Sequence, residues 1–290
     1  MHDEQKKWFY LIGLSIIWGS SFILIKKGLV GLSAYQLGAL RMLLTALFLF
    51  LYGFKSIFKI PRDKWKWIVV TALLSTFFPV FFFALAETKI DSAVVSVLNS
   101  LVPLFALIIG GVFFRAGVLR QQLFGVIVGL VGTLILILHG ATIGGGQDYR
   151  YSILVILASM GYASNVNILK YHLKDVSALA ISVGNFVVLL IPSILILYFT
   201  SFFTKATLSD RTVQVSMLYI AILALFGTAI AKVLFNKLIK ISNPVFSASV
   251  TYLIPIIAVL WGLIDGERFA FIQVVGAATI LGGVYLVNRK

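Results

Sequence analysis

The stretch SAVVSVLNSLVPLFALIIGGVFF, residues 92–114, contains no charged side chain. An α-helix rises about 1.5 Å per residue, so about 20 apolar residues cross a hydrocarbon core of about 30 Å. The stretch is therefore predicted to be a membrane-spanning helix. Asn99 and Pro103 lie near its middle, and membrane helices tolerate such residues where the backbone lines a cavity or bends.

Nine other segments share this character, and the composition of the whole chain agrees with it. Of the 290 residues, 60% are hydrophobic and 12% are charged. The mean hydropathy is +1.05, which excludes a water-soluble fold. The ten predicted spans are residues 8–25, 33–54, 67–86, 92–114, 121–138, 152–169, 177–203, 213–236, 244–264 and 269–287. The predicted fold class is an all-α polytopic membrane protein with ten transmembrane helices.

The positions of the basic residues predict how the chain is oriented. Lys and Arg number 24 in all, and the formal net charge is +14. With ten spans, fifteen of these residues fall on the side of the termini and seven on the other, and Arg41 and Lys232 remain inside spans. Basic loops stay in the cytoplasm, so both termini are predicted to be cytoplasmic. The charge lies between apolar segments rather than on one soluble face, so we expect no nucleic-acid partner.

The two halves of the chain resemble each other. Asn99-Ser-Leu-Val-Pro103, followed by Gln122, Gly125 and Gly132, matches Thr251-Tyr-Leu-Ile-Pro255, followed by Gln273, Gly276 and Gly283. Trp18-Gly-Ser-Ser-Phe22 with Lys26 likewise matches Tyr162-Ala-Ser-Asn-Val166 with Lys170. Five spans per half is an odd number, so the halves cross the membrane in opposite senses. We therefore predict two inverted five-helix repeats, residues 1–146 and 147–290, which can rock about a central site.

These motifs resemble the ten-helix EamA-type transporters of the drug/metabolite transporter superfamily over nearly the whole chain. The features that carry the resemblance are Trp18-Gly-Ser-Ser-Phe22, Arg41, Pro103, Pro255 and the turn Gly266-Glu-Arg268. Members export or take up amino acids, sugars, nucleotide derivatives and other metabolites, so the resemblance names no substrate. It implies a central cavity lined by the first, third, fourth, sixth, eighth and ninth helices. Lys232 stands where members commonly have an aromatic residue.

Polar residues at helical spacing mark candidate substrate contacts in the eighth span. Thr228, Lys232 and Asn236 recur every four residues and so share one face. A lysine at the middle of a membrane helix costs about 2.5–3.5 kcal/mol on insertion scales. Lys232 can either serve a wet cavity or extend to the head groups at the helix end, and its polar neighbours favour the cavity.

The fourth and ninth spans each combine polar residues with a proline. Asn99 lies one turn before Pro103, and Thr251 lies one turn before Pro255. Proline frees a backbone carbonyl, so Asn99 and Thr251 are candidate substrate contacts and the two prolines candidate hinges. Hydrogen bonding between helices is the alternative role for Asn99.

Aromatic and small polar residues pair in the first and sixth spans. Trp18 with Ser21, and Tyr162 with Asn165, lie three residues apart on one helix face. Such pairs suit a pocket for an organic metabolite, although packing between helices also uses them. The resemblance favours a structural role for Arg41, such as bonding carbonyls of a neighbouring helix.

Charged residues at the outer end of the third and fourth spans form a candidate gate. Glu87 and Asp91 lie there with Lys89 between them, so pairing among themselves is the alternative role. No Asp or Glu lies within a predicted span, which favours facilitated diffusion or exchange over proton coupling.

The residue types of metal and catalytic sites are absent or scattered. There is no cysteine, and the three histidines His2, His139 and His172 are far apart. We therefore expect no metal, no cofactor and no enzymatic activity. The predicted function is a secondary transporter of small organic metabolites across the bacterial inner membrane, with export of amino acids favoured. A flippase for lipids or lipid intermediates with the same fold is the alternative. Expected partners are a zwitterionic or anionic small molecule and membrane lipid.

Overall fold

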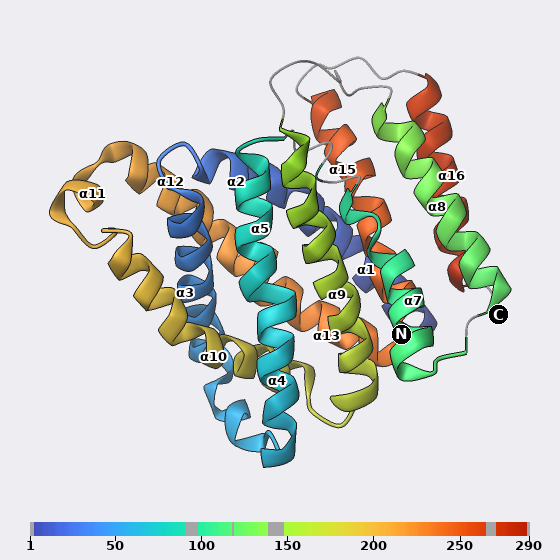
Figure 1. The fold of residues 1–290 in the computed structure, drawn as a ribbon, viewed down its shortest axis with the longest axis horizontal. Helices are drawn as coiled ribbons and strands as arrows, with labels where there is room; N and C mark the ends of the chain where they lie inside the picture. Colours follow the sequence, from blue (N-terminus) through green and yellow to red (C-terminus); the bar gives the residue numbers. More distant parts are fainter. Residues whose placement is uncertain are drawn as a thin grey trace.

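The computed structural model describes residues 3–90, 95, 98–117, 119–138, 148–264 and 271–288. In these residues the chain forms helices joined by short turns and contains no β-strand (Figure 1). The first part of the chain contains α1 (Asp3–Gly19), α2 (Ser21–Gly28), α3 (Ala34–Gly53), η1 (Phe54–Lys59), η2 (Arg62–Lys64), α4 (Trp65–Ala72), η3 (Leu73–Phe77), α5 (Phe78–Glu87), α7 (Val102–Phe114) and α8 (Arg120–Leu138).

The second part of the chain repeats this pattern of long helices separated by short ones. It contains η4 (Tyr149–Tyr151), α9 (Ser152–His172), α10 (Ala178–Phe199), α11 (Lys205–Ser209), α12 (Arg211–Ile222), η5 (Leu223–Ile230), α13 (Ala231–Ile241), α14 (Pro244–Ala248), α15 (Val250–Ile264) and α16 (Phe271–Asn288). Two of the short elements, η3 and η5, are π-helical turns. Each lies inside a longer continuous helix, so each part of the chain has one helix with a widened turn.

Six helices of the described residues are long and apolar enough to cross a membrane. They are Glu4–Gly28, Ala34–Lys59, Arg62–Glu87, Ser152–His172, Ala178–Phe199 and Arg211–Ile241. Large apolar side chains also cover the outer surface, including Leu51, Phe113, Ile191, Leu218 and Leu281. An exterior of this kind suits contact with lipid rather than water.

Three of the predicted spans are interrupted rather than continuous. The first breaks at Ser20, between α1 and α2, and the ninth breaks at Ser249, between α14 and α15. In the fourth, a turn at Ser100 and Leu101 precedes α7. The hydroxyls of Ser20 and Ser249 donate to carbonyls of their own preceding turns, so these polar side chains are paired locally at the breaks.

Two matching serine caps begin long helices in the two parts of the chain. Ser33 caps α3 and accepts a hydrogen bond from the Gln36 N–H, while the Gln36 side chain accepts from the Ser33 N–H. Ser177 caps α10 and accepts from the Ala180 N–H. Such caps supply partners to N–H groups that have none within the helix.

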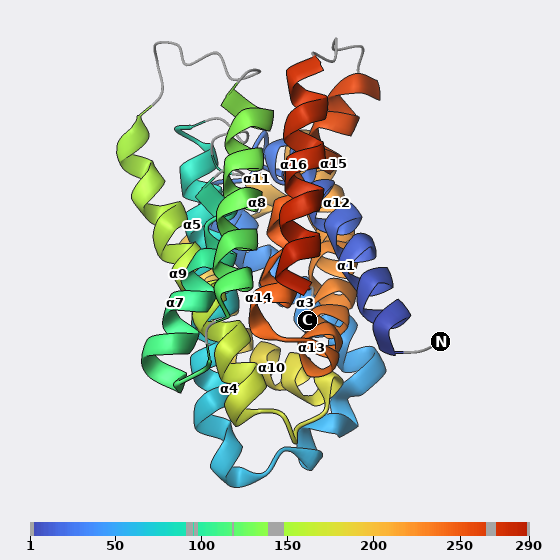
Figure 2. The ribbon, with the colours of Figure 1, turned by 90° about the vertical axis from the view of Figure 1, so that its right-hand side faces the viewer.

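Helices α8 and α16 lie side by side at one edge of the molecule (Figures 1 and 2). Glycines permit this close approach, because a Cβ at Gly125 would lie 2.9 Å from the Gly283 carbonyl, and one at Gly132 would lie 2.9 Å from the Gly276 carbonyl. The four glycines are those that match between the halves of the sequence. Small residues of this kind let membrane helices pack backbone to backbone.

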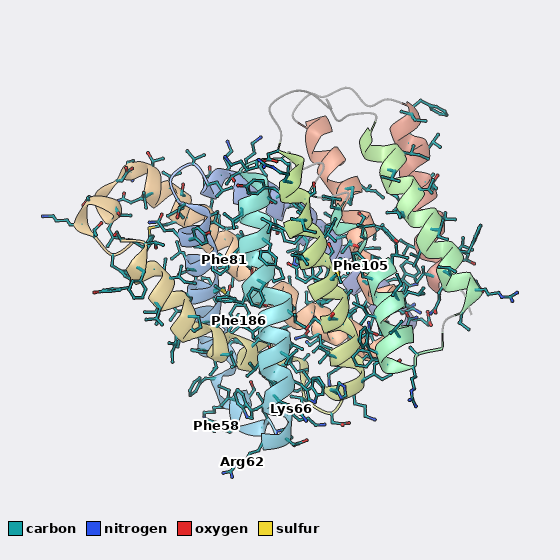
Figure 3. The ribbon with its side chains drawn as sticks, viewed as in Figure 1. Phe58, Arg62, Lys66, Phe81, Phe105 and Phe186 are labelled. Atoms are coloured by element: carbon teal, nitrogen blue, oxygen red, sulfur yellow. The ribbon has the colours of Figure 1, made fainter. Side chains whose placement is uncertain are left out.

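One end of the helices carries both chain termini (Figure 1) and basic residues that include Lys7, Arg62 and Lys66. We call it the basic end. Near the N-terminus, the Lys7 ammonium stands 5.2 Å from the centre of the Phe246 ring. At the same end, Trp67 stacks on His172 with ring centroids 3.8 Å apart. Figure 3 shows Arg62 at the tip of the segment that joins α3 to α4 and Lys66 near the start of α4, while Phe81 and Phe186 lie within the body of the helices.

The glycine contacts predict different effects for two neighbouring substitutions in α16. A Cβ at Gly283 would lie 2.5 Å from the Gly129 nitrogen, whereas a Cβ at Gly282 would meet nothing within 4 Å. We expect Gly283→Ala to lower the free energy of unfolding by about 1–3 kcal/mol, because the backbone of α8 must move. Thermal unfolding of the purified protein in detergent measures this, with Gly282→Ala as the matched control. Equal midpoints for the two variants would contradict the packing described.

Candidate functional site

A cavity of about 130 Å³ lies at the centre of the molecule. Residues of α1, α2, α3, α5, α7, α9, α13, α14 and α15 line it, together with both π-helical turns. Eight of the nine residues predicted to contact substrate lie on its wall: Trp18, Ser21, Asn99, Tyr162, Asn165, Thr228, Lys232 and Thr251. Side chains from both halves of the sequence therefore meet around one space, which has room for several waters or one small molecule.

Lys232 is held by the π-helical turn η3 on the opposite wall. Its ammonium donates to the Ser75 carbonyl at 3.1 Å, to the Ser75 hydroxyl at 2.5 Å and to the Thr76 hydroxyl at 2.8 Å. The Ser75 carbonyl is available because Pro79, four residues later, has no N–H to offer it. Only 8% of Lys232 is exposed, so it does not extend to head groups. All three acceptors are neutral, and the charge has no acidic partner among them.

Arg41 is the second cation on the cavity wall. Its Nε donates to the Thr228 hydroxyl at 2.8 Å, and that hydroxyl donates to the Leu223 carbonyl inside the π-helical turn η5. Arg41 thus binds a neighbouring helix through a side chain rather than through the carbonyls that the resemblance implied. Among the described residues that line the cavity, none carries a carboxylate.

Asn99 and Asn165 present buried oxygen atoms at the cavity. They are 5% and 2% exposed, and the side-chain oxygen of each has no hydrogen-bond partner within the described part of the chain. A buried acceptor without a partner is costly. Each is therefore placed to accept a hydrogen bond from a molecule in the cavity.

Aromatic rings form the apolar part of the wall. The Trp18 indole donates to the Gly227 carbonyl at 2.9 Å and packs edge-on against Phe235. The ring of Tyr162 stacks near Phe83 with centroids 6.0 Å apart. The two residues that match between the halves thus both lie at the cavity, Trp18 anchored to a carbonyl and Tyr162 to a second ring.

Asn236 differs from the other predicted contacts, because it does not line the cavity. Its amide donates to the Ser182 hydroxyl at 3.0 Å and to the Ala178 carbonyl at 3.4 Å. Asn236 shares a helix face with Lys232, as predicted, but α10 covers that face one turn further along. It therefore joins α13 to α10 in this structure.

The two candidate hinge prolines occupy different positions. Pro255 lies inside α15 and leaves the Thr251 carbonyl without its helical N–H. The Ser100 hydroxyl, from the break before α7, donates to that carbonyl at 3.3 Å. Pro103 lies in the first turn of α7, where a missing N–H costs nothing. The bend in this segment therefore precedes Pro103.

The candidate outer gate is only partly described. Glu87 ends α5, is half-buried and lies within electrostatic range of Arg41. Asp91 and the turn at residues 266–268 lie outside the described residues.

Ser75 and Thr76 were not identified from the sequence, although they hold Lys232. The available signal was a pair of adjacent hydroxyl residues within a predominantly apolar span, followed by Pro79. Polar residues in membrane helices commonly face the protein interior, so the same reasoning that singled out the eighth span applied here.

Comparison with known families gives a match over both parts of the chain. The model of the EamA-like transporter family matches residues 5–138 and residues 150–289. One solved crystal structure superposes with a TM-score of 0.75 at 16% identity, covering 96% of this chain and 94% of that chain. The structural likeness shows that the fold is shared.

Several relatives match along nearly their whole length. A protein of Salmonella typhimurium named as a probable amino-acid metabolite efflux pump is 26% identical over 98% of this chain and 95% of its own. An uncharacterized transporter of Archaeoglobus fulgidus is 27% identical over 99% and 100%. The inner membrane transporter YedA of Escherichia coli K12, named as uncharacterized, is 24% identical over 96% and 89%. The chain belongs to the EamA-like transporter family of the drug/metabolite transporter superfamily, and it is an integral transporter of the inner membrane.

Proposed function

We propose that the protein exports small zwitterionic metabolites, amino acids first among them, by alternating access to the central cavity. The observation that carries this proposal is the pair of cations on the cavity wall, Arg41 and Lys232, among described lining residues that include no carboxylate. Two positive groups facing one cavity repel each other, and a substrate carboxylate between them removes that repulsion. Ionisable groups at membrane depth mark substrate pathways by default.

The remaining polar groups of the cavity suit the other end of such a substrate. The side-chain oxygens of Asn99 and Asn165 lack partners and accept hydrogen bonds from an ammonium group. Trp18 and Tyr162 supply flat apolar surface for a substrate side chain. Ser21 and Thr251 add hydroxyl groups at the same wall. Each half contributes an asparagine and an aromatic residue, so the substrate binds between the halves.

Ten transmembrane helices in two inverted five-helix repeats, residues 1–146 and 147–290, provide the moving parts. Two separate matches to one family model, at residues 5–138 and 150–289, support the division. The crossed glycine contacts of α8 and α16 support it too, because exchanging the halves turns the contact of Gly125 with Gly283 into that of Gly276 with Gly132. The basic end, with both termini, faces the cytoplasm by the rule for basic loops.

The name of the Salmonella typhimurium relative, a probable amino-acid metabolite efflux pump, supports export and the substrate class. With no carboxylate among the described lining residues, movement follows the substrate gradient or an exchanged substrate rather than a carboxylate-bound proton. Pro255, inside α15, acts as a hinge beside the cavity, and in the segment of Pro103 the turn at Ser100 and Leu101 that precedes α7 acts as the hinge.

Substitution of Lys232 tests the charge recognition. We expect Lys232→Ala to reduce export of the transported class by about 10- to 100-fold, because the electrostatic attraction between the buried ammonium and the substrate carboxylate is lost. Cells overproducing the wild type or the variant are compared by mass spectrometry of metabolites inside and outside, relative to cells with empty vector.

The matched control is Lys237→Ala, which removes an exposed lysine five residues later on α13. Lys232→Met keeps the length of the side chain and separates loss of folding from loss of function. Wild-type export by correctly folded Lys232 variants would overturn the role of this charge. Selective movement of cationic or uncharged metabolites would overturn the substrate class.

Substitution of Asn165 tests the recognition of the amino group. In proteoliposomes, we expect Asn165→Ala to raise the KM for an amino acid by about tenfold, through loss of a hydrogen bond to a charged donor. The KM for the matching carboxylic acid without an amino group should stay unchanged, which provides an internal control. An equal rise for both compounds would assign Asn165 to packing.

Substitution of Pro255 tests the hinge. An alanine there restores the N–H that bonds the Thr251 carbonyl and displaces the Ser100 hydroxyl. We expect Pro255→Ala to lower the turnover rate severalfold while the substrate Kd changes less than about twofold, because the cavity wall is retained. Single-turnover and binding measurements separate the two quantities, and equal losses in both would argue against a hinge.

A further inference from the structure

Lys170 binds the end of a neighbouring helix at the basic end of the molecule. Its ammonium donates to the carbonyl of Ile239 at 3.3 Å, to that of Lys240 at 3.4 Å and to that of Ser242. Lys170 lies near the end of α9, and its acceptors belong to the end of α13 and the residue after it. These are the two helices that carry Tyr162, Asn165 and Lys232 at the cavity.

The contact is electrostatically favourable and joins parts that are far apart in sequence. The last carbonyls of a helix have no N–H partner within it, and the helix dipole places partial negative charge there. A second lysine strengthens the contact between these two helices, because the Lys240 ammonium donates to the Lys174 carbonyl at 2.6 Å. Helix α9, the loop after it and α13 are therefore drawn together at this end.

The matching lysine of the first half is in a different environment. Lys26 stands 144 residues before Lys170, as Trp18 does before Tyr162. Lys26 is exposed, and its ammonium makes no hydrogen bond or ion pair with another residue that the structure describes. The two halves thus place equivalent lysines in unequal states, one bound to a helix end and one in solvent.

The helix end that matches the acceptors of Lys170 also exists in the first half. The π-helical turns η3 and η5 contain Thr76 and Thr228, which stand 152 residues apart. The same offset relates Glu87, Thr88 and Ile90 to Ile239, Lys240 and Ser242. The end of α5 is therefore the counterpart of the end of α13, and it lies at the opposite end of the molecule.

We propose that Lys170 and Lys26 are alternating locks, of which Lys170 is closed in this structure and Lys26 closes in the other state of transport. When Lys170 leaves the end of α13, the basic end opens. Lys26 then binds the carbonyls of residues 87–90 at the end of α5, with the Glu87 carboxylate beside it, and closes the opposite end. This inference rests on the alternating access of the proposed function.

A second cavity marks where the basic end opens. It measures about 120 Å³ and is lined by Leu107, Asn167, Tyr171 and Asn243 among others. Tyr171 directly follows Lys170, and Asn243 directly follows Ser242, so the lock borders this space. Asn167 is 1% exposed, and its side-chain oxygen has no hydrogen-bond partner within the described residues. Water that enters this cavity when the basic end opens would supply that partner.

The lock is tested by thiol labelling, for which the absence of native cysteine provides a clean background. Leu107→Cys reports on the cavity at the basic end, and Val80→Cys reports on the central cavity. Each reporter is placed in the wild-type, Lys170→Ala and Lys26→Ala chains. A membrane-impermeant maleimide is applied to the Val80→Cys chains from the end opposite the basic end, in spheroplasts, and to the Leu107→Cys chains from the basic end, in inside-out vesicles. We expect Lys170→Ala to raise the labelling rate of the Leu107→Cys thiol by about tenfold and to lower that of the Val80→Cys thiol.

Lys26→Ala is expected to shift the two rates the opposite way, and Lys170→Arg, which retains charge and donors, to restore the wild-type rates. If Lys170→Ala does not fold, Lys170→Met takes its place. Faster labelling of both thiols would show that Lys170 is only a stabilising helix cap, and unchanged or jointly slowed rates would also overturn the lock. Labelling uses no substrate, so it tests the lock separately from the proposed function. Reciprocal changes in the two labelling rates without amino-acid transport would overturn only the proposed substrate. Amino-acid transport without reciprocal changes in the labelling rates would overturn only the lock.

Discussion

A backbone carbonyl that has lost its helical partner must find another within the protein, because lipid offers none. This constraint determines how the centre of the molecule is built. Pro79 and Pro255 each release a carbonyl beside the cavity, at Ser75 and Thr251. Each is then bound by a side chain from the other half of the sequence, Lys232 in one case and Ser100 in the other. These two released carbonyls thus lie beside the cavity, and the side chains that bind them join the two halves of the chain there.

The same constraint explains how a lysine remains buried without an acid. Lys232 has three donors, and a released carbonyl with two hydroxyls accepts all of them, so its hydrogen-bonding capacity is satisfied while its charge is not balanced. Burying an unbalanced charge is costly, and Arg41 on the same wall adds to the cost. A negatively charged ligand lowers that cost in a way that none of the described lining residues does. This argument supports the proposed binding of a substrate carboxylate in the cavity.

Much of this arrangement follows from the sequence, and the exceptions have physical causes. Hydropathy located the long helices, and polar residues at helical spacing brought eight of nine candidate contacts to one cavity. Spacing alone identifies a shared helix face, but not which neighbouring helix covers each turn, and for this reason Asn236 packs against α10 instead. The π-helical turns carry no periodic signature, since one extra residue per turn shifts the register without changing composition. Ser75 and Thr76 became recognisable as partners of Lys232 only when two distant turns were seen to face each other.

The different environments of the matching residues Lys26 and Lys170 explain how the two states of such a protein can have similar free energies. If the halves exchange conformations, the bonds that Lys170 makes to a helix end are lost as Lys26 makes bonds of the same kind to the matching helix end. Most of the cost of opening one end is then offset by closing the other. A reversal from 1:99 to 99:1 requires about 5.5 kcal/mol of differential binding, and near-equal locks reduce what the substrate must supply. Positions at which the halves differ determine the remaining difference in free energy between the two states, and hence which state is preferred at rest. One such position is Glu87, whose match in the second half is Ile239.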